Sequence, residues 1–151
     1  MPELLIRKSI EVNAPVETLW RVLTDAAFIP QYMFGCNAET DWKPGSPLLW
    51  KGAADGKIYV KGQVIAFDPP QRLVYTIFDP NSTIQDIPAN YLTMTCNLEQ
   101  RGDSLSKLEF VQGDYAAVED GQNRYNHSLD GDDTVLQRIK KLAEAAAKDR
   151  N

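Results

Sequence analysis

Apolar and polar residues alternate at the start of the chain, where one parity carries Leu4, Ile6, Ile10 and Val12. This period of two predicts a half-buried strand over residues 4–12. After Pro15 the apolar positions change to helical spacing, at Val16, Leu19, Trp20 and Leu23. We therefore expect a short amphipathic helix that begins next to Pro15. A second short helix is predicted over residues 26–29, ended or kinked by Pro30.

Turn-forming residues divide the middle of the chain into short segments. Proline, glycine and aspartate gather at 44–45, 52–56, 68–70 and 101–103. The intervals predict strands near residues 46–51, 57–67, 72–78, 89–99 and 104–112. Connections this short imply antiparallel neighbours, and the apolar alternation in the last two strands gives a sheet with one face to be covered.

The covering element is an amphipathic helix predicted over residues 130–147. Asp132 and Asp133 would lie in its first turn and lysines near its end, each sign matching its end of the helix dipole. A helix of about 17 residues is roughly 25 Å long, enough to cross a sheet of this width. The expected fold class is therefore α+β.

The length of 151 residues predicts one domain over residues 1–151. Its formal net charge is −5. The whole charge imbalance lies in residues 114–133, which hold six acids and one base. Acidity argues against nucleic acid as a partner. Because we find neither a signal peptide nor an apolar run of membrane-spanning length, we expect a cytoplasmic protein without membrane insertion.

Three segments carry a resemblance to a known family: residues 14–25, residues 62–75 and the closing helix. In their order and separation they resemble the START-like helix-grip (SRPBCC) domains, and within them the activator of Hsp90 ATPase homologue 1-like family. The resemblance implies a curved antiparallel sheet wrapped around a long C-terminal helix, with two short helices after the first strand closing one end. Family members usually have Gly-Trp at the start of the last helix, where this chain has Gly131-Asp132.

The resemblance also implies an elongated apolar cavity between helix and sheet, of the kind that holds a lipid, polyketide, flavonoid or hormone. The family has no fixed catalytic set, and the resemblance implies no cofactor. Function therefore has to be argued from individual residues.

Catalytic chemistry has few candidates in this sequence. The single histidine, His127, lies in a polar segment and is interpreted as a surface or helix-capping residue. Its alternative role is that of an acid or base, with Tyr125 or Asp130, at the mouth of the cavity. Cys36 and Cys96 have no metal-binding spacing, and we expect both to be buried thiols without a metal.

Lys8 falls on the apolar side of the first strand. An unpaired buried charge is costly, so we expect a structural arrangement that avoids one. Three arrangements would do so: a β-bulge that turns the side chain outward, a snorkelling position at the sheet end, or a buried acidic partner. The alternative is a cationic anchor for a ligand carboxylate or enolate.

The remaining candidates for ligand binding are large side chains expected to face the space between sheet and helix, and two residues after Pro30 expected to form its lip. They are Trp50, Tyr75, Met94, Phe110 and Leu136, with Tyr32 and Met33 at the lip. An aromatic lining with one or two phenols suits a planar apolar ligand with few oxygens.

The leading hypothesis is a non-enzymatic protein that binds a small apolar or aromatic metabolite. A neutral ligand is favoured because it is compatible both with Lys8 and with the acidic segment expected near one end of the cavity. A cyclase, dehydratase or hydrolase acting in the same cavity is the second. The third, suggested by the family name, is a chaperone-associated protein of stress response. The Hsp90 activator has an additional N-terminal domain, for which a chain of 151 residues leaves no room. The sequence points to no particular protein partner.

Overall fold

The structure, a computed structural model, describes residues 4–129 and 134–148. Its elements, in chain order, are β1 (Ile6–Val12), α1 (Val16–Thr24), α2 (Ile29–Tyr32), β2 (Cys36–Glu39), β3 (Pro47–Gly52), β4 (Ile58–Asp68), β5 (Arg72–Ile77), the 3₁₀ helix η1 (Pro88–Asn90), β6 (Leu92–Gly102), β7 (Leu105–Gly113), the 3₁₀ helix η2 (Tyr115–Ala117), α3 (Gly121–Leu129) and α4 (Thr134–Lys148).

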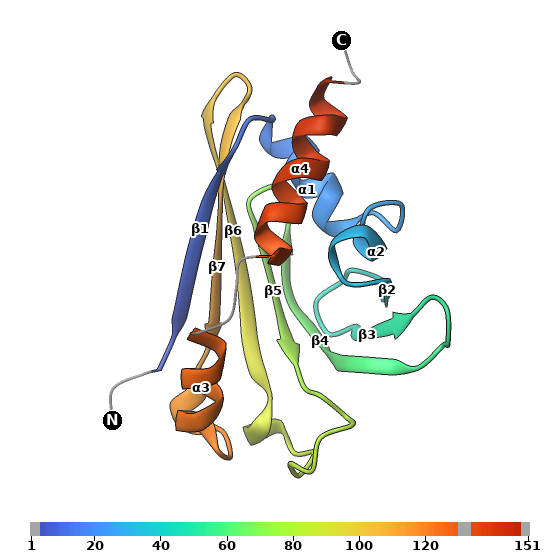
Figure 1. The fold of residues 1–151 in the computed structure, drawn as a ribbon, viewed down its shortest axis with the longest axis vertical. Coiled ribbons are helices and arrows are strands. Elements are labelled where there is room, and N and C mark those ends of the chain that lie inside the picture. The colour runs from blue at the N-terminus through green and yellow to red at the C-terminus, as the bar shows by residue number, and fades with distance from the viewer. Residues whose placement is uncertain (1–3, 130–133, 149–151) are drawn as a thin grey trace.

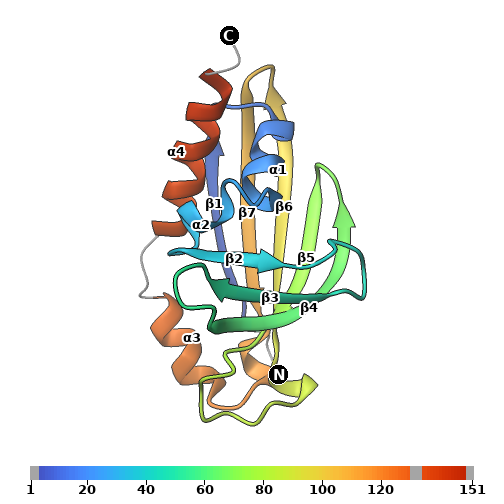
Figure 2. The ribbon, with the colours of Figure 1, turned by 90° about the vertical axis from the view of Figure 1, so that its right-hand side faces the viewer.

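The seven strands form one antiparallel sheet in the order β1-β7-β6-β5-β4-β3-β2. The sheet is strongly curved: β2 and β3 run across the direction of β1, β6 and β7 (Figure 2). The bend is made by β4, where the pairing with β5 shifts register between Val64 and Ala66, as at a β-bulge. Curvature of this kind gives the sheet a concave face.

The C-terminal helix α4 lies along α1 and against β1, and the short α2 lies beside it (Figure 1). The main hydrophobic core lies between these helices and the concave face, with Leu19, Val64, Leu108 and Ile139 fully buried. The predicted α+β helix-grip fold is confirmed.

Helix α2 corrects the prediction of a helix over residues 26–29 ended by Pro30. Pro30 instead lies in the first turn of α2, where its missing N–H costs no helical hydrogen bond. The edge strand β2, the helix α3 and the two 3₁₀ helices were not expected from the sequence. Helix α3 lies at the end of the sheet opposite the C-terminal end of α4 (Figures 1 and 2).

Glu144 fastens α4 to the corner between β1 and α1. Its Oε2 accepts hydrogen bonds from the backbone N–H of Asn13 at 2.9 Å, from Nδ2 of Asn13 at 3.1 Å and from Nζ of Lys140 at 2.7 Å. Lys140 also donates to the backbone carbonyl of Glu11 at 2.9 Å. Partial burial raises the pKa of Glu144, but these bonds outweigh that effect and hold its pKa below the usual value. The contact joins residues 131 positions apart and fixes the helix that covers the sheet.

The acidic segment has local structural uses. Asp114 Oδ1 accepts from the backbone N–H groups of Leu4 and Ala116, both at 2.9 Å, and so caps η2. Asp120 directly precedes α3 and accepts from the Asn123 side chain at 2.9 Å. The acids predicted to cap the last helix lie outside the described residues, as do Gly131 and Asp132, the site of the departure from the family pattern.

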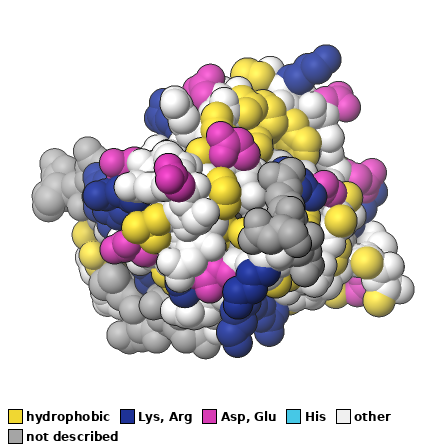
Figure 3. Space-filling model, turned by 90° about the horizontal axis from the view of Figure 1, so that it is seen from above, with side chains coloured by type: hydrophobic (Ala, Val, Ile, Leu, Met, Phe, Trp, Pro, Cys, Tyr) yellow, Lys and Arg dark blue, Asp and Glu magenta, His cyan; other side chains and the backbone are white. Residues whose placement is uncertain are grey.

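Acidic and basic side chains are interspersed on the end of the molecule seen from above (Figure 3). In the described part of the chain, no helix is long and apolar enough to cross a membrane.

Candidate ligand-binding cavity

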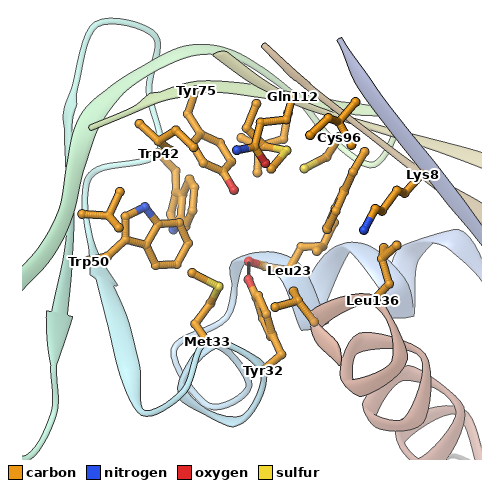
Figure 4. A pocket seen from close by; sticks show the side chains of 17 residues that line it. Lys8, Leu23, Tyr32, Met33, Trp42, Trp50, Tyr75, Cys96, Gln112 and Leu136 are labelled. Carbon is orange, nitrogen blue, oxygen red and sulfur yellow. Dashed lines mark hydrogen bonds between the residues drawn. The ribbon is translucent and has the colours of Figure 1, made fainter. Parts of the chain in front are cut away.

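A cavity of about 380 Å³ lies between the concave face of the sheet and the helices α1, α2 and α4 (Figure 4). This volume is within the usual range of small-molecule sites. Most of the wall is apolar or aromatic, and it comes from every strand except β2. The lining residues are Ile6, Lys8, Leu23, Tyr32, Met33, Trp42, Trp50, Val60, Leu73, Tyr75, Ile77, Met94, Cys96, Phe110, Gln112, Val135 and Leu136.

All eight residues that the sequence singled out for ligand binding lie on this wall: Lys8, Tyr32, Met33, Trp50, Tyr75, Met94, Phe110 and Leu136. The strands bring them together because residues of one parity share a face, and the register places Tyr75 opposite Met94 and Lys8 opposite Phe110. That these residues bind a ligand stays a prediction.

Other wall residues were missed. Cys96 and Gln112 continue the parity of Met94 and Phe110, so extending the same alternation by one position on each strand would have found them. Trp42 lies in the loop between β2 and β3 with a positive φ of 55°, and no periodic signal marks it. Trp42 stacks on Phe67, with ring centroids 5.9 Å apart.

Lys8 projects toward the cavity (Figure 4). The β-bulge considered from the sequence is wrong, because β1 pairs with β7 in continuous register from Ile6 to Val12. The side chain is half-buried, with Lys8 near the middle of the strand. Because β1 is an edge strand of the sheet, the snorkelling position stays a prediction, as does the acidic partner.

Two tyrosines face each other across the cavity (Figure 4). The hydroxyl of Tyr32 donates to the backbone carbonyl of Leu23 at 2.7 Å. The hydroxyl of Tyr75 points into the cavity and has no hydrogen-bond partner among the residues that the structure describes. Burial, with smaller contributions from Cys96 and Tyr32, raises the pKa of Tyr75 well above its ordinary value. Tyr75 therefore stays protonated and can donate a hydrogen bond to a ligand.

The two cysteines differ in environment. Cys96 is buried on the cavity wall, and desolvation raises the pKa of its thiol to about 12. Cys36 is half-buried, which corrects the expectation that both are buried, and desolvation followed by the nearby Asp55 raises its pKa as well. Within residues 4–129 and 134–148, no group of three or more potential ligands could hold a metal ion.

The catalytic candidates are not assembled on the described wall. His127 belongs to α3, but its side chain is outside what the structure describes, as is Asp130. Tyr125 is not on the cavity wall; it packs edge-on against Tyr115, with ring centroids 5.9 Å apart.

An antiparallel sheet curved around a C-terminal helix, with an apolar cavity between them, defines a helix-grip protein of the START-like class. The model of one family in this class, activator of Hsp90 ATPase homolog 1-like protein, matches residues 13–144, so the chain belongs to that family.

Solved structures agree with this assignment. A protein from Cytophaga hutchinsonii, whose structure was determined in solution, is 31% identical, with 98% of this chain and 99% of that chain covered and a TM-score of 0.72. A protein from Mesorhizobium loti is 19% identical, with 93% and 97% covered and a TM-score of 0.71. An Hsp90 activator from Plasmodium falciparum is 18% identical, with 83% and 87% covered and a TM-score of 0.61; at this identity the likeness is one of fold. Comparison with curated proteins gives no match.

Proposed function

We propose that this protein binds a small, neutral, hydrophobic or aromatic metabolite, of the lipid, polyketide or flavonoid kind, in the cavity between the sheet and α4. The observation that carries the proposal is the cavity itself, about 380 Å³ of mostly apolar space with the unpartnered hydroxyl of Tyr75 directed into it. Tyr75 is half-buried, and a hydroxyl that faces a mostly apolar space can gain a hydrogen bond to a ligand oxygen.

The ligand is proposed to be neutral because most of the wall is apolar, and a charged group that does not reach Lys8 would be costly to transfer there. Aromatic side chains favour flat ligands: Trp50 and Tyr75 pack on each other, with centroids 5.9 Å apart, and both line the cavity. Met33, which lies across the cavity from Tyr75 in Figure 4, has the flexibility to adapt to ligands of different outline.

A direct test is fluorescence titration with N-phenyl-1-naphthylamine, followed by its displacement with flavone, a planar neutral ligand with a carbonyl oxygen. We expect Tyr75→Phe to lower the affinity for flavone about fivefold, because one hydrogen bond is lost. Tyr91→Phe is the matched control: its hydroxyl donates to Asp86 at 2.7 Å, away from the cavity, and flavone should bind as in the wild type. Absence of probe binding to the wild-type protein would overturn the proposal, and equal effects of the two variants would remove the role of Tyr75.

Native mass spectrometry of the purified protein, before and after denaturation, gives an independent readout. A bound metabolite should appear as an added mass in the native spectrum and be released on unfolding.

Catalysis in the same cavity is less well supported. A cyclase or dehydratase needs a group that accepts a proton near neutral pH, and the raised pKa values of Tyr75 and Cys96 leave both protonated there. The enzymatic alternative is tested by turnover of a polyketide or ester that disappears in His127→Ala.

Association with a chaperone is the alternative suggested by the family name and by the name of the Plasmodium protein. Its test is stimulation of Hsp90 ATPase activity by the purified protein. A cytoplasmic location and a role in stress response stay predictions from the sequence and its resemblance.

A further inference from the structure

A second space, of about 560 Å³, lies beneath α3, at the end of the sheet away from the C-terminal end of α4. We call it the α3 compartment. Its wall is formed by Val60, Ile77, Phe78, Asp79, Leu92, Gln112, Tyr115, Asp120, Asn123 and Arg124. Three of these residues, Val60, Ile77 and Gln112, also line the central cavity. The two spaces are therefore neighbours that share side chains as their common wall.

Gln112 is the polar member of this common wall. Its Nε2 donates to the hydroxyl of Tyr115 at 2.8 Å, and Tyr115 is itself buried in the wall of the α3 compartment. The side chain of Gln112 is half-buried and faces the central cavity (Figure 4), where the register places Met94 between it and Tyr75. A long unbranched side chain has several rotamers, so this part of the wall can move aside at the cost of that hydrogen bond, which a polar group of the ligand can replace.

Polarity changes from one space to the other. The central cavity is mostly apolar, whereas the α3 compartment combines a buried apolar part, which includes Phe78 and Leu92, with polar residues at its rim. The polar residues are Asp79, Asp120, Asn123 and Arg124. Two carboxylates against one guanidinium disfavour an anion at this rim, while a hydroxyl or amide finds both donors and acceptors there.

We propose that the ligand is elongated and amphipathic: its apolar body fills the central cavity, its chain passes Gln112, and its neutral polar end lies in the α3 compartment. This inference rests on the proposed function, since it extends the same site. It makes Gln112 and α3 the elements that select for ligand length.

The test uses neutral n-alkanols, from hexanol to tetradecanol, as competitors of N-phenyl-1-naphthylamine. In the wild type, affinity should rise about fourfold with each added methylene group as long as the chain finds apolar space. Asn123→Trp places an indole in the α3 compartment from an exposed position on α3, and the rise should then stop at a shorter chain.

Asn126→Trp is the matched control. Asn126 is exposed on the same helix and lines neither space; its side chain accepts from Gln122 at 3.1 Å. Its length dependence should equal that of the wild type. Circular dichroism of both variants reports whether α3 keeps its helix.

The outcomes separate the two proposals. If neither the probe nor any alkanol binds the wild type, the proposed function fails. In a second outcome the probe and short alkanols bind, but affinity stops rising at the same chain length in the wild type and in Asn123→Trp. The ligand site then ends at Gln112. This result overturns the inference and leaves the proposed function standing.

Discussion

Enlarging two valines on β4 distinguishes an empty cavity from a packed core. Val60 lines the cavity and is half-buried, whereas Val64, four residues along the same strand, is fully buried in the main core and lines none of the spaces described above. Phenylalanine adds four carbon atoms at either position, worth up to about 3 kcal/mol if all were taken out of water. At Val60 roughly half of that area is newly covered, and about 0.5 kcal/mol is lost as rotamer entropy, which leaves a net stabilisation of about 1 kcal/mol.

At Val64 there is no space for the ring, and overpacking should cost about 1–3 kcal/mol. Thermal unfolding followed by circular dichroism should therefore show Val60→Phe melting about 2–4 °C above the wild type and Val64→Phe clearly below it. Val60→Phe should also weaken binding of N-phenyl-1-naphthylamine, because the ring would occupy part of the cavity. Equal destabilisation by both substitutions would refute the reasoning, since it would mean that the region beside Val60 is already filled.

Two further predictions concern titratable groups. Glu144→Gln should cost about 1 kcal/mol at pH 7, because the charge-assisted bonds to Asn13 and Lys140 weaken. Since the folded-state pKa of Glu144 is lowered, this stability is present above the ordinary glutamate pKa of about 4.3 and is lost as pH falls through the folded value. Urea titrations should thus show wild type and variant converging below about pH 4; a constant difference would contradict the assignment. Ellman's reagent at pH 8 should react first with the half-buried Cys36, and with Cys96 only after unfolding; two equally fast thiols would show that Cys96 is accessible.

Most of the fold was predictable because its elements carry strong local patterns. The period of two in β1, β6 and β7, and the helical spacing in α1 and α4, are set by burial of one face, and the structure has that face inside. Strand β2 lacks such a signal: Cys36-Asn37-Ala38-Glu39 has no β-branched residue, and its pairing with β3 defines it.

Helix α3 was missed for a related reason. Its sequence, Gly121 to Leu129, is largely polar and shows no helical stripe of apolar residues. One contact that holds it is the packing of Tyr125 on Tyr115, which helical periodicity does not reveal. The position of Pro30 shows a further limit: proline is compatible with the first turn of a helix and with its end, and tertiary packing decides between them.

The cavity wall was predictable to the extent that it follows strand parity. Tyr75, Met94 and Phe110 were found in this way, and Cys96 and Gln112 could have been. Trp42 could not, because its direction is set by a loop and by stacking on Phe67.

Under the proposed function, the empty volume beside the core also links the lifetime of the protein to the abundance of its ligand. A molecule that binds only the folded state, at one hundred times its dissociation constant, adds about 2.7 kcal/mol to folding stability. That change lowers the unfolded fraction about a hundredfold, and proteases act on that fraction. Molecules without ligand would be degraded first, so the amount of protein in a cell would follow the supply of the metabolite.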